Sequence, residues 1–328
     1  MRKWLSFTIV AVIGSIVLVA CGSDDANGDG DTFQIGATQI VEHPSLDAAY
    51  DGFKDALDDQ GLDVEYDFQS AQNDVSNAGT IGKNFVSDDV DLIFANSTPS
   101  AMGAKQATSD IPIVFTSVTD AEIAGLVESN DEPGENVTGV VDLHPDQITR
   151  TIEFIDDNFP DSTIGMVYNA GEENSVVQVE YVKEALEGTT LDMTDRSIST
   201  SAEVQQAASS LVGEADVFYI ITDNTAVSAL ESIIGVANDN DMPLFVGEPD
   251  SVEKGGFMAF GFDYYDLGYR SGEMAAEILT DDKEAGELSV EFPPNVEVYM
   301  NKEAAEAQGI DWNDEWEEDA NLVETEEE

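Results

Sequence analysis

The stretch VDLIFANST at residues 90–98 decides the fold, because a short apolar run passes directly into small polar residues that can begin a helix. Such a run is typical of a strand buried on both faces of a parallel sheet. The stretch ADVFYIITDN at residues 215–224 repeats the arrangement. Each is followed by a helical segment and by a second apolar run, IPIVF at 111–115 and MPLFV at 242–246. This internal symmetry predicts two similarly wound lobes.

Strands and helices alternate outward from these two stretches. The predicted strands cover residues 32–37, 63–68, 90–95, 111–115, 163–168, 191–198, 217–221 and 243–246. The predicted helices cover residues 45–60, 74–87, 97–107, 149–159, 175–186, 202–212, 225–239 and 265–279. This alternation predicts the α/β class, with two doubly wound lobes that each have a parallel sheet covered by helices on both faces.

The segments after the second lobe, 255–262, 265–279 and 296–300, form no new unit and are predicted to pass back through a hinge. We therefore expect a first lobe of residues 32–142 plus 264–288. The second lobe is expected to contain residues 143–263 plus 289–310. The acidic tail, residues 311–328, is expected to fray, and no role is assigned to it.

The first 21 residues have the pattern of a secretory signal peptide, with basic Arg2 and Lys3 followed by an apolar run over 4–20. Cys21 is the only cysteine, so it forms no internal disulfide. The tetrapeptide LVAC at 18–21 resembles the bacterial lipobox, in which this cysteine is acylated. An apolar membrane anchor with an incidental cysteine is the alternative. Residues 22–31 have no apolar periodicity and are expected to be a flexible spacer.

The charge balance is strongly acidic, with 12 Lys and Arg against 69 Asp and Glu and a formal net charge of −57. Such a surface repels nucleic acid and anionic headgroups, so neither is expected as a partner. The acids are spread along the chain. Cation buffering is one interpretation, and a solvated acidic surface suited to high salt is the favoured one.

Ligands of open parallel sheets bind beyond the carboxyl ends of the strands, where helices begin. Six turns at these ends are polar, and a cleft between two such rims suits a small polar solute. The candidate ligand-binding residues are Gln39, Ile40, Glu42, His43, Ser97, Thr98, Ser100, Thr116, Ser117, Asn169, Asn174, Ser175, Thr222, Asp223, Asn224 and Asp250.

Each of these residues also has a structural interpretation, because Ser, Thr, Asp and Asn at a helix start are usually N-caps. His43, beside Pro44, is either a ligand contact or a turn residue. The hydroxyls of the first lobe suit a carboxylate, whereas Asp223 and Asp250 of the second suit an ammonium. This division predicts an amino acid bound as a zwitterion across the cleft.

Catalytic and cofactor chemistry finds little support in the sequence. The two histidines, His43 and His144, stand in no metal-ligand pattern, and the cysteine is assigned to the anchor. The chain has no Gly-x-Ser-x-Gly elbow and no Gly-rich phosphate loop. We therefore expect no enzyme activity, no cofactor and no metal.

Several segments together resemble one family, the ABC-transporter substrate-binding lipoproteins that include tryptophan- and tyrosine-binding proteins. The resemblance extends from about Phe33 to about Ile310 and is carried by residues 39–48, 95–101, 113–120, 136–140, 168–169, 173–175, 222–225 and 263–268. It implies a type I periplasmic-binding fold with three hinge crossings, and an aromatic amino acid as the ligand.

The resemblance also implies a monomer outside the cytoplasm, held to the cell membrane by its lipid and working with an ABC permease and ATPase. Three alternatives remain open: a ligand-sensing ectodomain of the same fold, a site for a sugar-like or nucleoside-like solute, and an enzyme on a doubly wound scaffold.

Overall fold

A computed structural model describes residues 32–281, 283–293 and 296–326. The predicted signal peptide, Cys21 and the spacer lie outside the described residues. In the described part of the chain, no helix is both long and apolar enough to span a membrane.

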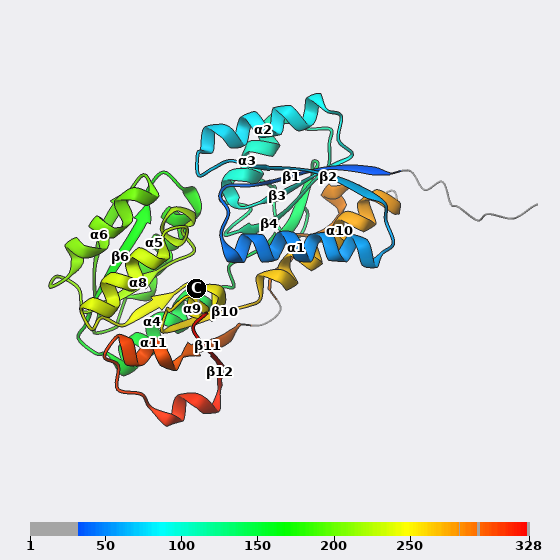
Figure 1. Cartoon of the computed structure of the whole chain (residues 1–328). Helices are drawn as coiled ribbons and strands as arrows, with labels where there is room; N and C mark the ends of the chain where they lie inside the picture. Colours follow the sequence, from blue (N-terminus) through cyan, green and yellow to red (C-terminus); the bar gives the residue numbers. More distant parts are fainter. Residues whose placement is uncertain (1–31, 282, 294–295, 327–328) are drawn as a thin grey trace, which may run out of the picture. The chain divides into compact units, whose positions relative to one another are not determined.

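The first sheet is parallel and has the strand order β2-β1-β3-β4-β5. Its strands are β1 (Phe33–Gln39), β2 (Val64–Ser70), β3 (Leu92–Asn96), β4 (Ile113–Val118) and β5 (Val137–Val141). Helices α1 (Pro44–Asp59) and α10 (Tyr264–Thr280) cover one face, and α2 (Val75–Ser87) and α3 (Thr98–Ala107) cover the other (Figure 1). Since both faces are covered, β3, β4 and β5 are buried at every position.

Helices α1 and α10 pack closely because glycines face the partner backbone. A Cβ atom on Gly52 would lie 2.1 Å from the carbonyl oxygen of Tyr265, and one on Gly268 would lie 1.8 Å from that of Ala49. Beneath them, the rings of Phe53 and Phe94 stack at 4.0 Å. The start of α10 is thereby fixed beside the first sheet.

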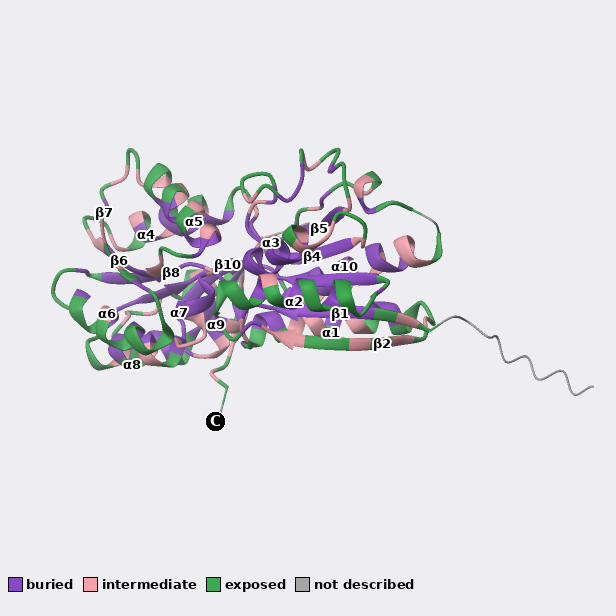
Figure 2. Ribbon diagram, turned by 90° about the horizontal axis from the view of Figure 1, so that it is seen from above, coloured by how far each residue is buried: buried purple, intermediate pink, exposed green. Residues whose placement is uncertain are grey.

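The second sheet has the order β12-β11-β10-β9-β8-β6-β7, and only the β10–β11 pair is antiparallel. Its strands are β6 (Thr163–Asn169), β7 (Asp192–Ile198), β8 (Val217–Ile220), β9 (Leu244–Val246), β10 (Met258–Gly261), β11 (Glu297–Asn301) and β12 (Ala320–Val323). Helices α4 (Gln147–Asn158) and α5 (Glu173–Ala185) pack on one face, and α6 (Val204–Leu211) and α8 (Leu230–Asp239) on the other. Figure 2 shows exposed positions along the outer side of α6 and α8, which lie below buried strands in this view. The α/β class with two doubly wound lobes is confirmed.

Four short elements differ from the expected pattern. The helix predicted at 225–239 is two helices, α7 (Asn224–Val227) and α8, because the chain leaves helical geometry at Ala229. The Ser228 hydroxyl donates to the Thr225 carbonyl oxygen at this break. Strand β5 was not predicted, because Thr138 and Gly139 interrupt its apolar run. Helices α9 (Pro249–Glu253) and α11 (Lys302–Ala307) were not predicted either, since each is too short to show a helical periodicity.

The C-terminal segment does not fray, contrary to the expectation from its acidity. Residues 314–318 form a 3₁₀ turn, and β12 pairs in parallel with β11. The Trp316 ring lies 5.5 Å from that of Phe154 and 5.6 Å from that of Phe257. Apolar packing beside the sheet therefore outweighs the repulsion among the acids of this segment.

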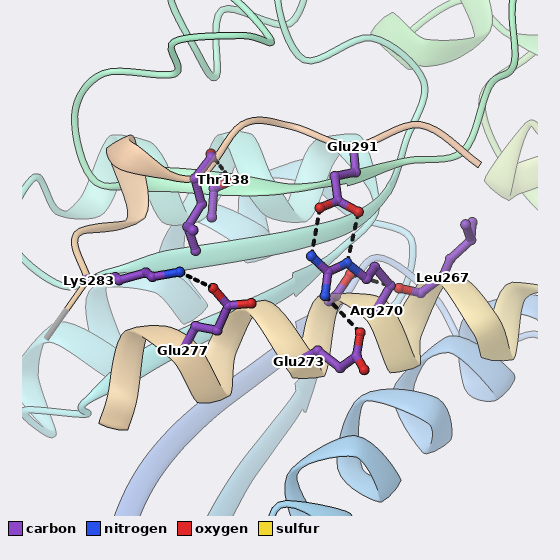
Figure 3. A network of polar contacts seen from close by, with 9 residues as sticks. Thr138, Leu267, Arg270, Glu273, Glu277, Lys283 and Glu291 are labelled. Atoms are coloured by element: carbon purple, nitrogen blue, oxygen red, sulfur yellow. Dashed lines mark hydrogen bonds and ion pairs between the residues drawn. The ribbon is translucent and has the colours of Figure 1, made fainter. Parts of the chain in front are cut away.

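Three crossings join the lobes, after β5, after β10 and before β11. The expected boundary at residue 289 is displaced, because Glu291 donates its backbone N–H to the Gly139 carbonyl oxygen and stays with the first lobe. The Arg270 guanidinium of α10 holds both carboxylate oxygens of Glu291, at 2.8 and 2.7 Å (Figure 3). The third crossing therefore follows Glu291.

Candidate functional site

Residues at the carboxyl ends of strands from both lobes line a small, partly open space, the inner cavity, of about 10 Å³. This volume holds about one water molecule. Its lining contains three carboxyl groups and, among the described residues, no lysine or arginine. The lining residues are His43, Leu46, Ser117, Asp142, Thr222, Asp223, Asn224, Val227, Glu248 and Tyr264.

Asp142 follows β5 and is 5% exposed. Its Oδ2 accepts a hydrogen bond of 2.8 Å from the Tyr264 hydroxyl. Its Oδ1 is buried without a hydrogen-bond partner. Burial raises the pKa of this carboxyl to about 6, although the bond from Tyr264 acts in the opposite direction. Asp142 therefore lines the inner cavity with one oxygen that makes no direct hydrogen bond, and the nearby Thr119 side chain also lowers the pKa of this carboxyl.

Asp223 is fully buried and begins α7 as its N-cap. Its Oδ1 accepts from the Ala226 N–H at 2.7 Å. Its Oδ2 accepts from the Asn169 N–H and from the Ser175 hydroxyl, both at 2.6 Å. Burial, and then the nearby Glu172 carboxylate, raise the pKa of Asp223. Both oxygens are already used within the lobe, so the capping interpretation accounts for Asp223.

Glu172 completes this network from the turn before α5. It accepts hydrogen bonds from the backbone N–H groups of Asn224 and Thr225 and from both their side chains, at 2.6–3.2 Å. The N-terminus of α7 is thereby satisfied by two buried carboxyl groups. These bonds hold Asn224 at the wall of the inner cavity, and the Gln178 side chain holds Thr222 there.

Glu248 precedes α9 and is 2% exposed. Its Oε1 accepts from the Ser251 hydroxyl at 3.0 Å. Burial, and secondly the neighbouring Asp250 carboxylate, raise the pKa of Glu248 to about 8. Burial also raises the pKa of Asp250. The N-cap and the first turn of α9 thus supply two carboxyl groups, Glu248 and Asp250, in which burial opposes ionisation.

A second space, the outer cleft, has a volume of about 230 Å³ and shares His43, Val227 and Glu248 with the inner cavity. Its other lining residues are Glu42, Pro44, Ser228, Ala229, Leu230, Glu231, Ser232, Asp250, Ser251 and Lys254. Burial lowers the pKa of His43 to about 4, so its ring is neutral near pH 7. His43 Nδ1 is buried without a hydrogen-bond partner, while the Asn224 side chain lies beside the ring and partly offsets the effect of burial on its pKa.

Several hydroxyl groups of the first lobe are engaged in hydrogen bonds within that lobe. The Ser97 hydroxyl caps α3 by accepting from the Ser100 N–H at 3.3 Å. Thr98 Oγ1 accepts from the Thr119 N–H at 3.4 Å, and the Ser117 hydroxyl donates to Asn96 Oδ1 at 2.7 Å. Ser97 and Ser117 have φ angles of 117° and 56°, strained values for residues other than glycine. Strain of this kind concentrates at functional sites.

Five of the sixteen predicted residues line the inner cavity, namely His43, Ser117, Thr222, Asp223 and Asn224. Glu42 and Asp250 line the outer cleft. The other nine lie around these spaces without lining them. Ile40 is core, Gln39 holds Asp47, and Asn169 and Ser175 hold Asp223. Ser97 and Thr98 make the bonds given above, while Ser100, Thr116 and Asn174 each retain a buried oxygen without a partner.

Asp142, Glu248 and Tyr264 were missed by the sequence reasoning. Asp142 follows the rule for carboxyl ends, but β5 had not been assigned as a strand. Glu248 follows the strand predicted at 243–246, where Asp250 was chosen as the candidate ligand-binding residue. The position of Asp142 and of Glu248 just after a strand was therefore a sequence signal for both acids.

Several hydrogen bonds join the lobes around the site. The Asn73 amide donates to Thr225 Oγ1 at 2.9 Å. The Gln178 amide of the second lobe donates to Thr119 Oγ1 of the first at 3.1 Å and to Thr222 Oγ1 at 2.7 Å. These bonds stabilise the arrangement in which the inner cavity is enclosed.

A larger cleft of about 700 Å³ lies on the other side of Thr119, lined by residues that include Asp120, Ile148, Tyr181 and Phe292. It contains none of the sixteen predicted residues. Among its described lining residues, no side chain has a buried polar atom without a partner. The described residues also contain no group of three or more side chains suited to a metal ion. The inner cavity therefore has the stronger features of a binding site.

Comparison with known proteins identifies the family. The model of the family "ABC transporter substrate binding protein" matches residues 34–323. A tyrosine-binding protein of Clostridioides difficile (strain R20291) is 40% identical over 320 residues, which cover 93% of this chain and 92% of that protein.

Two solved structures share the fold. An ABC domain from Streptococcus pneumonia in complex with L-Trp has a TM-score of 0.84 and 30% identity, covering 89% of this chain and 99% of that one. The ligand-free, open structure of a substrate binding protein with adhesive properties from Clostridium difficile has a TM-score of 0.66 and 39% identity, covering 90% and 100%. The type I periplasmic-binding fold is confirmed. The chain belongs to the family of ABC transporter substrate-binding proteins, which bind solutes and are not enzymes.

Proposed function

We propose that this protein captures an aromatic α-amino acid between its lobes and delivers it to an ABC importer. The observation that carries the proposal is the inner cavity, where Asp142 has a free buried oxygen and no cationic side chain is among the described lining residues. A buried carboxylate requires a positive partner, and the ammonium of an amino acid supplies one. The names of the tyrosine-binding relative and of the L-Trp complex support an aromatic side chain.

In this proposal the ammonium lies between Asp142 and Glu248, while Asp223 fixes the surrounding backbone. This changes the sequence-based prediction, which assigned the ammonium to Asp223 or Asp250. The carboxylate lies toward Ser117 and the N-terminus of α3, where backbone N–H groups favour an anion. The aromatic ring extends past His43 into the outer cleft.

Ligand entry requires the lobes to separate, because about 10 Å³ cannot admit an amino acid. The higher TM-score on the L-Trp complex than on the open, ligand-free structure supports an enclosed arrangement. Closure of this kind is a hinge motion about the three crossings. The hydrogen bonds from Asn73 and Gln178 would form as the lobes close.

The anchor and the environment are part of the same proposal. We infer that residues 1–21 direct export and that Cys21 carries the lipid that holds a monomeric protein at the outer side of the cell membrane. The permease and the ATPase of the importer are its partners. The net charge of −57 favours a high-salt environment.

Calorimetry of the purified protein with L-tyrosine, L-tryptophan, L-phenylalanine, a neutral sugar and a nucleoside tests the ligand. Micromolar or tighter binding of at least one aromatic amino acid, with none of the sugar or nucleoside, is the expected result. Binding of the sugar or nucleoside alone would refute the amino-acid proposal. Uptake of the bound amino acid by cells lacking the gene then separates an importer component from a sensing ectodomain, because only the former changes uptake.

A further inference from the structure

The C-terminal segment, residues 312–326, contacts the same lobe that supplies Glu248 to the site. We call it the C-terminal strap. Its strand β12 pairs with β11 in the register Val298↔Ala320 to Asn301↔Val323. Trp312 and Trp316 pack beside the second core, and the Lys302 ammonium pairs with Glu317 at 2.7 Å. The strap is therefore attached along its length.

Beyond β12 the strap reaches α9, the short helix that follows Glu248. The Glu326 backbone N–H donates to the Glu253 carbonyl oxygen at 2.9 Å. The Glu326 carboxylate pairs with the Lys254 ammonium directly after the helix. A five-residue helix leaves most of its carbonyl oxygens without intrahelical partners, so an external donor at its C-terminus stabilises it.

Asn301 connects the strap to the same helix from inside the lobe and is fully buried. Its Nδ2 donates to the Val252 carbonyl oxygen at 3.0 Å and to Thr325 Oγ1 at 2.9 Å. Its Oδ1 caps α11 by accepting from the Ala304 N–H. One side chain thus joins α9, α11 and the strap, and the end of α9 is held from two sides.

The start of α9 is held by two other bonds: the Ser251 hydroxyl donates to Glu248 Oε1, and the Gln147 amide donates to the Gly247 carbonyl oxygen. The N-cap residue Glu248 makes no capping bond with its side chain and lines the inner cavity. The position of Glu248 and Asp250 therefore depends both on these bonds and on how firmly the end of α9 is held. A displacement of about 1 Å in a site of this kind can change affinity strongly.

We propose that the C-terminal strap is a positioning element of the ligand site, which holds α9 and thereby places Glu248 and Asp250. This inference rests on the proposed function for the identity of the ligand. It assigns a role to a segment whose acidity alone would indicate a solvated tail. No residue of the strap lines the inner cavity or the outer cleft, and its one contact with a lining residue is the pair between Glu326 and Lys254 of the outer cleft.

Two adjacent residues of β12 provide a matched pair of variants. Val323 packs against the core of the second lobe, whereas Leu322, on the other face of the strand, is 50% exposed. Val323→Asp should detach the strap, and Leu322→Asp adds the same charge without removing a packed side chain. A chain ending at Asp319 removes β12 but keeps Trp316, and serves as a second form of the detached strap.

Hydrogen exchange of residues 249–254 and calorimetry with L-tyrosine are measured on the full chain and each variant. In Val323→Asp and in the shortened chain, exchange should be about tenfold faster or more. Their dissociation constants should rise about tenfold or more. Leu322→Asp should stay within about twofold of the parent in both measurements.

The exchange result separates the strap from the identity of the ligand. Unchanged exchange at 249–254 in both disrupted forms would overturn the inference, whatever the ligand is. Faster exchange with an unchanged dissociation constant would also overturn it, because α9 would then be held by the strap without affecting the site. If the parent binds none of L-tyrosine, L-tryptophan and L-phenylalanine, the proposed function fails while the exchange still decides whether the strap holds α9.

Discussion

Asp142→Asn is the substitution that tests the site most directly. Asparagine has almost the same shape, and its Oδ1 can still accept the hydrogen bond from Tyr264. What is lost is the negative charge beside the free oxygen of the inner cavity. The change should therefore separate ligand affinity from stability.

The expected loss of affinity is large because the ammonium remains in the closed cleft without a charged partner. Truncating one member of a buried charge pair costs about 2–5 kcal/mol. This corresponds to an increase in the dissociation constant of about 30-fold to several thousand-fold. A capping or purely structural role for Asp142 predicts almost no change in affinity.

Stability should change in the opposite direction. The pKa of Asp142 is raised from 3.8 to about 6 in the folded protein, so the folded state binds this proton more tightly than the unfolded state does. Its contribution to the free energy of unfolding therefore falls as pH rises from about 4 through about 6, by roughly 3 kcal/mol in total. Asp142→Asn removes this loss, so the variant should match the parent near pH 4 and exceed it near pH 8.

Urea unfolding at the two pH values and calorimetry with L-tyrosine or L-tryptophan make the measurement. Asp58→Asn, at an exposed position on α1, is the control and should alter neither quantity. An Asp142→Asn protein that binds the amino acid as tightly as the parent would refute the placement of the ammonium. A variant less stable than the parent near pH 8 would refute the conclusion that burial raises the pKa of Asp142.

Three further outcomes follow from the proposed function. Cys21→Ser should release the protein from the membrane fraction or leave it unprocessed. A variant that stays with the membranes as the parent does, together with a parent that carries no acyl group, would contradict the lipid anchor. The melting temperature should rise clearly between dilute buffer and molar salt, because a net charge of −57 repels itself at low ionic strength; a flat curve would mean that the acids are locally compensated. Solution scattering should give a smaller radius of gyration with saturating ligand, and an unchanged profile would indicate a rigid site.

The sequence predicted the fold well because long buried strands and amphipathic helices leave strong periodicities. The runs at 90–98 and 215–224 became β3 and β8 with the expected helices after them. Some elements were missed: β5 because Thr138 and Gly139 interrupt its apolar run, and α9 and α11 because they offer too few positions for a helical period. The strap was misjudged for another reason: acidic composition indicated a solvated tail, whereas Trp312 and Trp316 supply local packing that composition does not show.

The sequence-based selection of site residues stays a prediction, and the structure shows only which of them lie together. Reading the carboxyl ends of the strands led to His43, Ser117, Thr222, Asp223 and Asn224 around the inner cavity. A sequence does not reveal which polar atoms satisfy one another. Asp223 was ranked above its neighbours although the fold uses both of its oxygens.

The acids of the site differ physically from the acids of the surface, although the residue types are the same. The surface acids lie in water, where salt screens a charge within a few ångströms, so they attract any cation weakly and select none. The carboxyls of Asp142 and Glu248 are buried, and their raised pKa values show that ionisation there is opposed by burial. An ammonium that enters the cavity compensates that penalty directly, and bulk salt cannot do so without entering as well. Under the proposed function, discrimination comes from the few carboxyls that are removed from water, so an ammonium site is compatible with a chain that carries 69 acidic residues.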